Sequence, residues 1–395
     1  MKYAVVLPDG ASDEPLADLG GKTPLEKARI PFMDQVALQG RLGRVVTIPE
    51  GFTPGTDVGT LSLFGYDPRR FYPGRAPLEA AARGLRAARD EMVFRCNLVT
   101  VLDGVMRDNT GGHVHQDETD ALIADLHAAL AGEGCAFHAG VTYRNFLLLA
   151  GAADLEVRCA PPHDILDQPV AGYRPAGPGG PRVREIEDRA AAVLADHPVN
   201  RRRRAEGRPP VTGIWLWGHG RPRELPSFGT RFGCRTAVIS AVDILRGLAV
   251  LAGMERIEVP GATGDLDTDY EAKGAAAVRA LDSYDLVIVH VEAADEAAHM
   301  GRADEKVRAL ERIDEAVVGP LLERLRRFPE WRILVAADHP TLVRTRGHSA
   351  VPPLFAYVGT GVPSGRGLPF DDRSADASGD WVREGHRLME VFLRT

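Results

Sequence analysis

Short apolar runs that end in polar turns recur along the chain and predict buried strands. These runs occupy residues 3–7, 286–291, 333–337 and 354–358. Continuous apolar runs of this length are typical of strands buried on both faces of a parallel sheet. Helical periodicity lies between them, at 237–252 and 306–325. Strands that alternate with helices predict an α/β fold with a mostly parallel sheet flanked by helices.

The middle of the chain has a different pattern. It contains apolar residues at 98–101, a charged helical stretch at 117–130, a segment rich in proline and glycine at 173–181 and a second helical pattern at 184–195. Proline and glycine are common in loops and at domain boundaries. We therefore expect an inserted smaller α+β domain at 101–205. The core would comprise 1–100 and 206–395 and would resume at the apolar residues 214–217.

The length and the charge of the chain narrow its class. A chain of 395 residues is long enough for two domains. Its 48 basic and 55 acidic residues give a net charge of −7, so no nucleic-acid or anionic membrane partner is expected. The single dense basic run, 201–204, is interpreted as a solvated domain boundary.

Other features favour a cytoplasmic enzyme that binds a small metabolite. No window approaches the ~18 apolar residues of a membrane span, and the apolar run at the N-terminus is too short for a signal peptide. The four cysteines form no CxxC pair, so we expect reduced thiols. The oligomeric state is not predicted.

Two nucleotide-binding patterns are incomplete. Gly20–Thr23 resembles the end of a phosphate-binding loop, but Leu16 stands where the pattern needs a glycine. Gly218–Arg223 begins like a dinucleotide fingerprint, but it lacks the third glycine and Pro222 disrupts the helix that should follow. We therefore expect no nucleotide cofactor.

Metal-ligating side chains gather at or just after the predicted strand ends, where parallel sheets place their chemistry. The candidates are Asp9, Asp295, His299, Asp338, His339 and His348. Asp295 and His299 are four residues apart, so a helix would place them on one face. A mixture of histidine and carboxylate ligands favours zinc or manganese over calcium. Turn chemistry or surface polarity is the alternative explanation for each residue taken alone.

The segment EGFTPGTDVGT, residues 50–60, follows neither a helical nor a strand period. It presents the hydroxyl of Thr56, and with the six candidate ligands this hydroxyl completes a possible two-metal site. Metal coordination would activate the hydroxyl as a nucleophile for phosphoryl transfer. Asp57 would orient the loop or bind nearby. The alternative is that Thr56 only caps a helix that begins at Asp57.

Several motifs resemble those of archaeal-type cofactor-independent (2,3-bisphosphoglycerate-independent) phosphoglycerate mutases, within the alkaline phosphatase superfamily. The resemblance extends nearly from end to end and is specific only when the motifs are taken together. The motifs are LPDG (7–10), PGTDV (54–58), LFGYDP (63–68), FRCNLV (94–99), GVTYR (140–144), PPHDI (161–165), GATG (261–264), HVEAADE (290–296), DH (338–339) and GHS (347–349).

This resemblance implies an alkaline-phosphatase-like core and a metal-dependent isomerase. Thr56 takes the position of the family's nucleophilic serine, which is a departure from the family pattern. One ion would be bound by Asp9, Thr56, Asp338 and His339, and the other by Asp295, His299 and His348. The ions would be manganese or zinc, with cobalt and magnesium as further possibilities, and no 2,3-bisphosphoglycerate would be needed. Thr56 would take the phosphoryl group from 3-phosphoglycerate and return it to the 2-oxygen.

The resemblance also implies substrate contacts from the inserted domain. Arg144 would clamp the phosphate or the carboxylate, because an arginine fork suits either group. His113 stands where the family has an AGH motif. Asp57, Arg75 and Lys306 are further candidates, and surface charge is the alternative explanation for Arg75 and Lys306.

Three other functions remain open. WLWGHG, at 215–220, resembles the WLWGQG of a bacterial subgroup proposed to phosphorylate homoserine. A phosphatase would let water intercept the phosphothreonine. A non-catalytic relative would keep the fold and bind a metabolite, but the complete set of seven ligands argues against it.

Overall fold

A computed structural model describes residues 1–394. The chain divides into two compact units, of which the first comprises Met1–Tyr72 with Glu224–Thr395 and the second comprises Pro73–Arg223. The second unit is thus larger than the inserted domain expected at 101–205. The reason is that residues 92–102 and 213–220 form two long strands of its own sheet, so neither segment belongs to the core.

The first unit contains an eight-stranded sheet. Its strands, in spatial order, are β15 (Trp381–Val382), β2 (Arg41–Val45), β14 (Leu354–Gly359), β11 (Trp331–Ala336), β1 (Lys2–Pro8), β10 (Leu286–Val291), β8 (Thr236–Ile239) and β9 (Glu255–Arg256). Neighbouring strands run parallel, except that β14 runs antiparallel to both β11 and β2. The predicted α/β fold with a mostly parallel sheet is confirmed.

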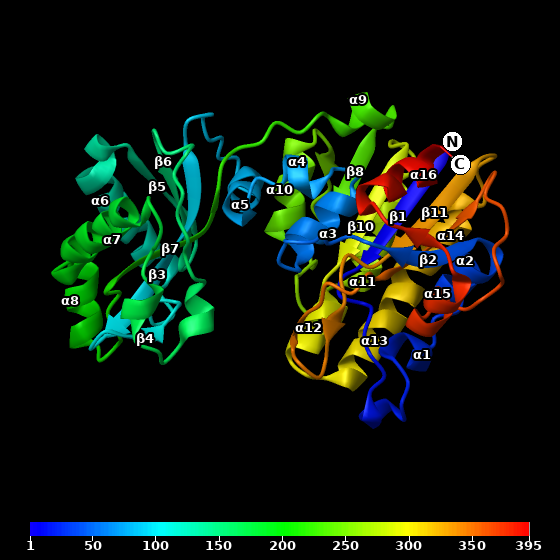
Figure 1. The fold of residues 1–395 in the computed structure, drawn as a ribbon, viewed down its shortest axis with the longest axis horizontal. Coiled ribbons are helices and arrows are strands. Elements are labelled where there is room, and N and C mark those ends of the chain that lie inside the picture. The colour runs from blue at the N-terminus through cyan, green and yellow to red at the C-terminus, as the bar shows by residue number, and fades with distance from the viewer. Residues whose placement is uncertain (395) are drawn as a thin grey trace. The chain divides into compact units, whose positions relative to one another are not determined.

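Helices surround this sheet (Figure 1). They are α1 (Pro24–Lys27), α2 (Pro31–Gln39), α3 (Thr56–Leu63), α4 (Pro68–Phe71), α9 (Phe228–Phe232), α10 (Asp243–Leu251), α11 (Tyr270–Ala280), α12 (Ala293–His299), α13 (Ala303–Ile313), α14 (Gly319–Leu325), α15 (Asp372–Ser378) and α16 (Leu388–Arg394). The predicted helix at 306–325 is present and contains one π-helical turn. The predicted helix at 237–252 is wrong in its first part, because Thr236–Ile239 pairs with β10.

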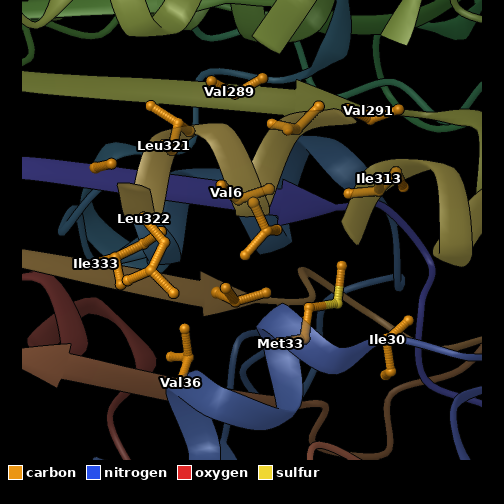
Figure 2. Packing of buried hydrophobic residues seen from close by; sticks show 14 of the residues in the cluster. Val6, Ile30, Met33, Val36, Val289, Val291, Ile313, Leu321, Leu322 and Ile333 are labelled. Carbon is orange, nitrogen blue, oxygen red and sulfur yellow. The ribbon is translucent and has the colours of Figure 1, made fainter. Parts of the chain in front are cut away.

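Apolar side chains fill the space between the sheet and its helices. Figure 2 shows one face, where Met33 and Val36 of α2 and Leu321 and Leu322 of α14 pack over the central strands. Strand β1 is buried on both faces, since residues 4–7 are each at most 1% exposed. This explains why its sequence is continuously apolar rather than alternating.

The strand order brings the predicted site residues to one edge. Strands β10, β1 and β11 are adjacent and parallel, so their carboxyl ends lie side by side. Asp9 follows β1, α12 follows β10, and Asp338 and His339 follow β11. A short ribbon of β12 (Thr341–Leu342) and β13 (Gly347–His348) continues from the same edge.

The second unit is built on an antiparallel sheet. The long strand β3 (Met92–Leu102) lies at its centre and pairs with β4 (Val105–Asp108), β6 (Arg144–Leu149) and β7 (Gly213–Gly220), while β5 (Cys135–Val141) pairs with β6. Its helices are α5 (Arg75–Ala82), α6 (Gln116–Leu130), α7 (Gly180–Ala195) and α8 (Pro198–Ala205). Helices α6 and α7 correspond to the predicted helical stretches, and their apolar faces pack on β3, β6 and β7.

The run 201–204 lies in α8, within the second unit rather than at its boundary. Three of its four arginines are exposed, as expected for a solvated run, but α8 buries Arg203 completely. Its guanidinium donates to the Glu118 carboxylate and to the carbonyl oxygens of Gly111 and Gly112, the latter two at 2.7 and 2.9 Å. Because all of these partners are buried or half-buried, the arginine is a structural part of the unit. Among residues 1–394, no helix has both the length and the apolar character needed to cross a membrane.

Candidate active site

The hydroxyl of Thr56 lies at the carboxyl edge of the first unit's sheet. Thr56 is the first residue of α3, and Gly55 rather than Thr56 occupies the capping position. The Thr56 side chain is buried, and its Oγ1 donates to Asp9 Oδ2 at 3.2 Å and lies 3.3 Å from His339 Nε2. The helix-capping alternative is therefore not supported, because the hydroxyl faces candidate metal ligands.

Two glycines allow the close packing around Thr56. A Cβ at Gly59 would lie 2.5 Å from the carbonyl oxygen of Asp338, so only glycine lets α3 approach the end of β11 this closely. Gly10 has a φ of +62° and would place a Cβ within 2.8 Å of Asp295 Oδ1. Both glycines belong to the motifs that surround Asp9 and Thr56 in the sequence.

The first cluster of candidate ligands comprises Asp9, Asp338 and His339. Their ligand atoms lie within 4.8 Å of one another, and all three residues are completely buried. His339 Nε2 lies 3.4 Å from Asp9 Oδ1 and 3.4 Å from Asp338 Oδ2. Neither of these two carboxylate oxygens has a hydrogen-bond partner within the part of the chain that the structure describes. Buried carboxylate oxygens without partners are costly unless a cation binds them.

The second cluster comprises Asp295 and His299 of α12 and His348 of β13. Asp295 Oδ2 lies 3.1 Å from His299 Nε2, and Asp295 Oδ1 lies 3.4 Å from His348 Nε2. The two histidine Nε2 atoms are only 2.9 Å apart. The His339 and His348 rings, with centroids 4.2 Å apart, connect this cluster to the first.

The Nδ1 atom of each of the three histidines faces an oxygen atom of the protein. His299 Nδ1 lies 2.9 Å from the carbonyl oxygen of Arg346, and His348 Nδ1 lies 3.2 Å from that of Pro54. His339 Nδ1 lies 3.2 Å from Thr341 Oγ1. A carbonyl oxygen accepts only, so the Nδ1–H groups of His299 and His348 donate, and their Nε2 atoms are the ones left to face a metal ion. Metal-ligating histidines show this arrangement.

The electrostatics of the clusters also favour bound cations. Burial, reinforced by the charges of Asp338 and Glu292, raises the pKa of Asp9 well above its usual range. Burial opposes ionisation of Asp295 too, but hydrogen bonds from His299 and His348 hold its pKa well below the usual range. The hydrogen bond to Asp295 raises the pKa of His299 to about 9. In the protein alone, protons take the place of the positive charge that these carboxylates require.

The residues fit a pair of divalent cations by their chemistry. Three imidazoles, three carboxylates and one hydroxyl converge, and orphaned buried oxygens lie among them. Such nitrogen and oxygen donors suit zinc and manganese. The structure thus brings together all seven predicted ligands: Asp9, Thr56, Asp295, His299, Asp338, His339 and His348.

Two residues near the clusters were not predicted. His290 Nε2 lies 2.9 Å from Asp9 Oδ2, and Glu292 lies within the reach of a shared ion with both. Burial lowers the pKa of His290 to about 4, and burial together with Asp295 raises the pKa of Glu292 to about 8. A histidine inside an apolar run was the signal in the sequence that could have identified this neighbourhood.

The second unit carries a separate cluster of arginines: Arg75, Arg95 and Arg144. Glu79 accepts from Arg75 Nε at 3.0 Å and pairs with Arg95 Nε at 3.1 Å. Burial lowers the pKa of Arg95 to about 10, and the charges of Arg75 and Arg144 act in the same direction. Guanidinium groups gathered in this way suit an anionic ligand.

Arg95 was missed by the sequence analysis, although it is a charged residue within an apolar strand. Its guanidinium lies 4.1 Å from the centre of the Trp217 ring, and Trp217 Nε1 donates to Asn97 at 3.0 Å. The exposed His163 packs against the same indole, with ring centroids 5.2 Å apart. Trp217 of the WLWGHG segment therefore packs against this arginine cluster.

The remaining predicted substrate residues are not all placed for binding. Lys306 is completely buried and its ammonium donates to three protein oxygens, so neither the substrate role nor the surface alternative fits it. Asp57 accepts from Val58 N at 3.0 Å and from the Tyr72 hydroxyl, which fits a role in orienting the loop. His113 is exposed with a φ of +52°, and no hydrogen bond joins its side chain to the arginines among residues 1–394.

Comparison with known proteins identifies the family. A family model described as 2,3-bisphosphoglycerate-independent phosphoglycerate mutase matches residues 37–200. A protein of that name from Methanothrix thermoacetophila is 47% identical over 394 residues, which cover 100% of both chains. The chain belongs to the family of 2,3-bisphosphoglycerate-independent phosphoglycerate mutases. The family resemblance predicted from the sequence is thereby confirmed.

Solved structures agree with this membership. The PH0037 protein from Pyrococcus horikoshii has a TM-score of 0.81 at 29% identity, with 99% of this chain and 96% of that chain covered. The cofactor-independent phosphoglycerate mutase from Thermoplasma acidophilum has a TM-score of 0.69 at 26% identity, with 100% and 99% covered. The similarity to these two structures thus extends over both units.

Proposed function

We propose that this chain interconverts 3-phosphoglycerate and 2-phosphoglycerate, without 2,3-bisphosphoglycerate, through a phosphothreonine at Thr56. The observation that carries this proposal is the position of the Thr56 hydroxyl. It lies 3.2 Å from Asp9 Oδ2 and 3.3 Å from His339 Nε2, beside the six other candidate ligands. Membership in a family of mutases supports the same reaction.

The candidate ligands would hold two divalent cations, in the two sets predicted from the sequence. When bound, such cations lower the pKa of a nearby hydroxyl and neutralise the charge of a transferring phosphoryl group. Manganese or zinc fits the mixed donors best, with cobalt or magnesium as alternatives. Asp9 Oδ2, which accepts from the Thr56 hydroxyl, orients the nucleophile.

The chemistry would proceed in two half-reactions at Thr56. First, a bond forms between Thr56 Oγ1 and phosphorus while the bond from phosphorus to the 3-oxygen of the substrate breaks. The proton that leaves Thr56 balances the one that the 3-oxygen takes up. The 2-oxygen of the glycerate then attacks the phosphothreonine and regenerates the hydroxyl. The first turn of α3 favours negative charge beside Thr56 throughout, because helix N-termini stabilise anions.

The arginine cluster of the second unit would bind the anionic groups of phosphoglycerate. Arg144 is exposed, and its guanidinium has no hydrogen bond or ion pair within residues 1–394, so its donors are available. Arg95 and Arg75 each pair with Glu79. Arginine forks recognise carboxylates and phosphates in a bidentate manner.

The cytoplasmic location expected from the sequence remains a prediction.

The test is a coupled assay that measures the formation of 2-phosphoglycerate from 3-phosphoglycerate without added bisphosphoglycerate. Chelator-treated protein would be assayed before and after the addition of Mn²⁺, with free phosphate measured in parallel. Thr56→Ala and Thr56→Ser would be assayed beside the wild type. Mass spectrometry of acid-quenched protein would look for phosphate on the peptide that contains Thr56.

We expect metal-dependent isomerisation that Thr56→Ala abolishes and Thr56→Ser retains in part, because serine keeps the nucleophilic hydroxyl. Phosphate should accumulate on Thr56 only in the presence of substrate. Release of free phosphate without isomerisation would instead identify a phosphatase. An equally active Thr56→Ala protein would contradict the proposed nucleophile.

A further inference from the structure

Thr341 differs from the other residues that face the Nδ1 atoms of the candidate ligand histidines. The Nδ1 atoms of His299 and His348 face backbone carbonyl oxygens, whereas the Nδ1 atom of His339 faces a side-chain hydroxyl, that of Thr341, at 3.2 Å. The same hydroxyl donates to Asp295 Oδ1. One side chain thus contacts both sets of candidate ligands, since His339 belongs to the first and Asp295 to the second.

We propose that Thr341 is a positioning residue that orients His339 and Asp295 for binding of the two divalent cations. This inference rests on the two-metal centre of the proposed function. It adds a residue that no sequence motif indicated and that contributes no ligand atom of its own. Its side chain is completely buried, so substrate contact is not an alternative role.

A single arrangement of protons satisfies both contacts of Thr341. The Asp295 carboxylate can only accept, so the Thr341 hydroxyl donates its proton to Oδ1. The Thr341 oxygen can then only accept from His339, which places the histidine proton on Nδ1. The Nε2 atom of His339 therefore keeps its lone pair, directed toward Asp9 Oδ1 and Asp338 Oδ2 at 3.4 Å each. Fixing the tautomer in this way is how partners of ligating histidines act.

The backbone around Thr341 is held firmly, which gives the hydroxyl a defined position. Thr341 pairs with His348 in the β12–β13 ribbon. Its carbonyl oxygen accepts from Lys306 Nζ at 2.7 Å, and this ammonium also donates to Asp13 Oδ2 at 2.8 Å and to the carbonyl oxygen of Ser12 at 3.2 Å. The buried ion pair of Lys306 and Asp13 thus fastens the Thr341 segment to the segment that follows Asp9.

Gly10 provides the space that the Thr341 hydroxyl occupies. A Cβ on Gly10 would lie 2.6 Å from Thr341 Oγ1 and 2.8 Å from Asp295 Oδ1, so any larger residue would displace both groups. The glycine next to Asp9 therefore permits the contact between Thr341 and Asp295. Serine at position 341 would keep the hydroxyl that makes both contacts, whereas valine would keep only the shape of the threonine side chain.

The test compares metal binding by Thr341→Val and Thr341→Ser with that of the wild type. Chelator-treated proteins would be titrated with Mn²⁺ alone, and the stoichiometry and Kd would be measured by calorimetry, with free Mn²⁺ followed by electron paramagnetic resonance. Thr47→Val is the matched control. Thr47 is a buried threonine of the same unit whose hydroxyl has no hydrogen-bond partner in the described chain. Thermal unfolding of the metal-free proteins would be recorded for each variant.

We expect Thr341→Val to weaken Mn²⁺ binding by roughly 10- to 100-fold, the usual effect of removing a partner of a metal ligand. Thr341→Ser should bind within a few-fold of the wild type, and Thr47→Val should not differ from it. Unchanged Mn²⁺ binding by Thr341→Val would overturn the inference while leaving the metal centre in place. An equal loss in Thr341→Ser and Thr341→Val would overturn it as well. A wild-type protein that binds no Mn²⁺ would overturn the metal centre itself, and the inference with it.

Discussion

The two units carry clusters of opposite charge. At the carboxyl edge of the first unit's sheet, Asp9 and Asp338 are completely buried, and each has an oxygen without a hydrogen-bond partner among the described residues 1–394. In the second unit, Arg75 and Arg95 pair with Glu79, and the charge of Arg144 acts on Arg95. The first cluster requires cations and the second favours an anion. A metal-dependent enzyme for a phosphorylated acid needs sites of both kinds.

Buried ion pairs elsewhere in the chain are examples of buried charges that have their partners within the protein. Lys306 places its ammonium on Asp13 and two carbonyl oxygens, and Arg203 places its guanidinium on Glu118 and three carbonyl oxygens. The burial of a charged side chain therefore does not by itself distinguish a metal-ligand site from a structural ion pair. The distinction lies in whether the buried charge has its hydrogen-bond partners within the protein.

The largest effect is expected from Asp338→Asn, which removes one of the uncompensated charges. Isomerase activity should fall by roughly 1,000-fold or more, because a ligand and its charge are lost from a two-metal site. The metal-free variant should nevertheless unfold at a higher urea concentration than the metal-free wild type, since the electrostatic repulsion between the carboxylates of Asp338 and Asp9 is removed. Activity assays and urea titrations of chelator-treated protein would check both. A variant that is less stable without metal would show that Asp338 is already compensated.

Lys306→Met should have the largest effect on folding. It leaves the buried carboxylate of Asp13 without its partner, and such a loss typically costs about 3–5 kcal/mol. Arg308→Met, on the same helix but exposed, should cost less than about 1 kcal/mol. Urea unfolding of the two variants would measure the difference. Similar stability of the two would mean that the Lys306 ion pair does not hold the edge of the sheet together.

Two buried glutamates of the second unit, Glu118 and Glu187, have pKa values shifted in opposite directions. Hydrogen bonds and charges from Arg208 and Arg203 overcome the effect of burial and lower the pKa of Glu118 to about 2. Burial raises the pKa of Glu187 to about 7, with only Arg174 and the N–H of Leu216 to oppose it. Because folded Glu187 binds a proton that the unfolded chain releases above its ordinary pKa, stability should fall as the pH rises from about 4.5 to 7.

Glu187→Gln should remove this contribution, which amounts to about 3 kcal/mol between the two protonation limits. The variant should therefore gain stability relative to the wild type as the pH is raised from 5 to 8. Urea unfolding at both pH values would measure the change. Parallel pH dependence in the two proteins would show that Glu187 is ionised in the folded state.

The smallest effect is expected from Arg144→Gln. Its guanidinium is exposed and has no ion pair among residues 1–394, so its loss should not affect folding. We expect KM for 3-phosphoglycerate to rise by about 10-fold with little change in kcat, the pattern of a lost uniform binding contact. Arg107→Gln, an exposed arginine of the same unit that pairs with Asp167, is the control. An unchanged KM would remove Arg144 from the anion site.

Local patterns in the sequence determined much of the first unit. The apolar runs at 3–7, 286–291, 333–337 and 354–358 each coincide with a strand, with only Ala337 beyond the end of β11, because burial on both faces leaves a continuous apolar signal. Parallel strands end at one edge, so polar residues placed after these runs had to meet. This is why Asp9, Asp295 and Asp338 could be grouped before their distances were known.

The tertiary structure alone decided which charged residues are compensated and where the units divide. Residues 92–100 and 213–220 were assigned to the core, because nothing local shows that the strands at 92–102 and 213–220 pair with each other across more than a hundred residues. Lys306 and Arg203 look like surface residues in the sequence, since a buried charge is recognisable only through partners distant in the chain. The same holds for Thr341, whose hydroxyl acquires its role from His339 and from Asp295, a residue that only the fold brings beside it.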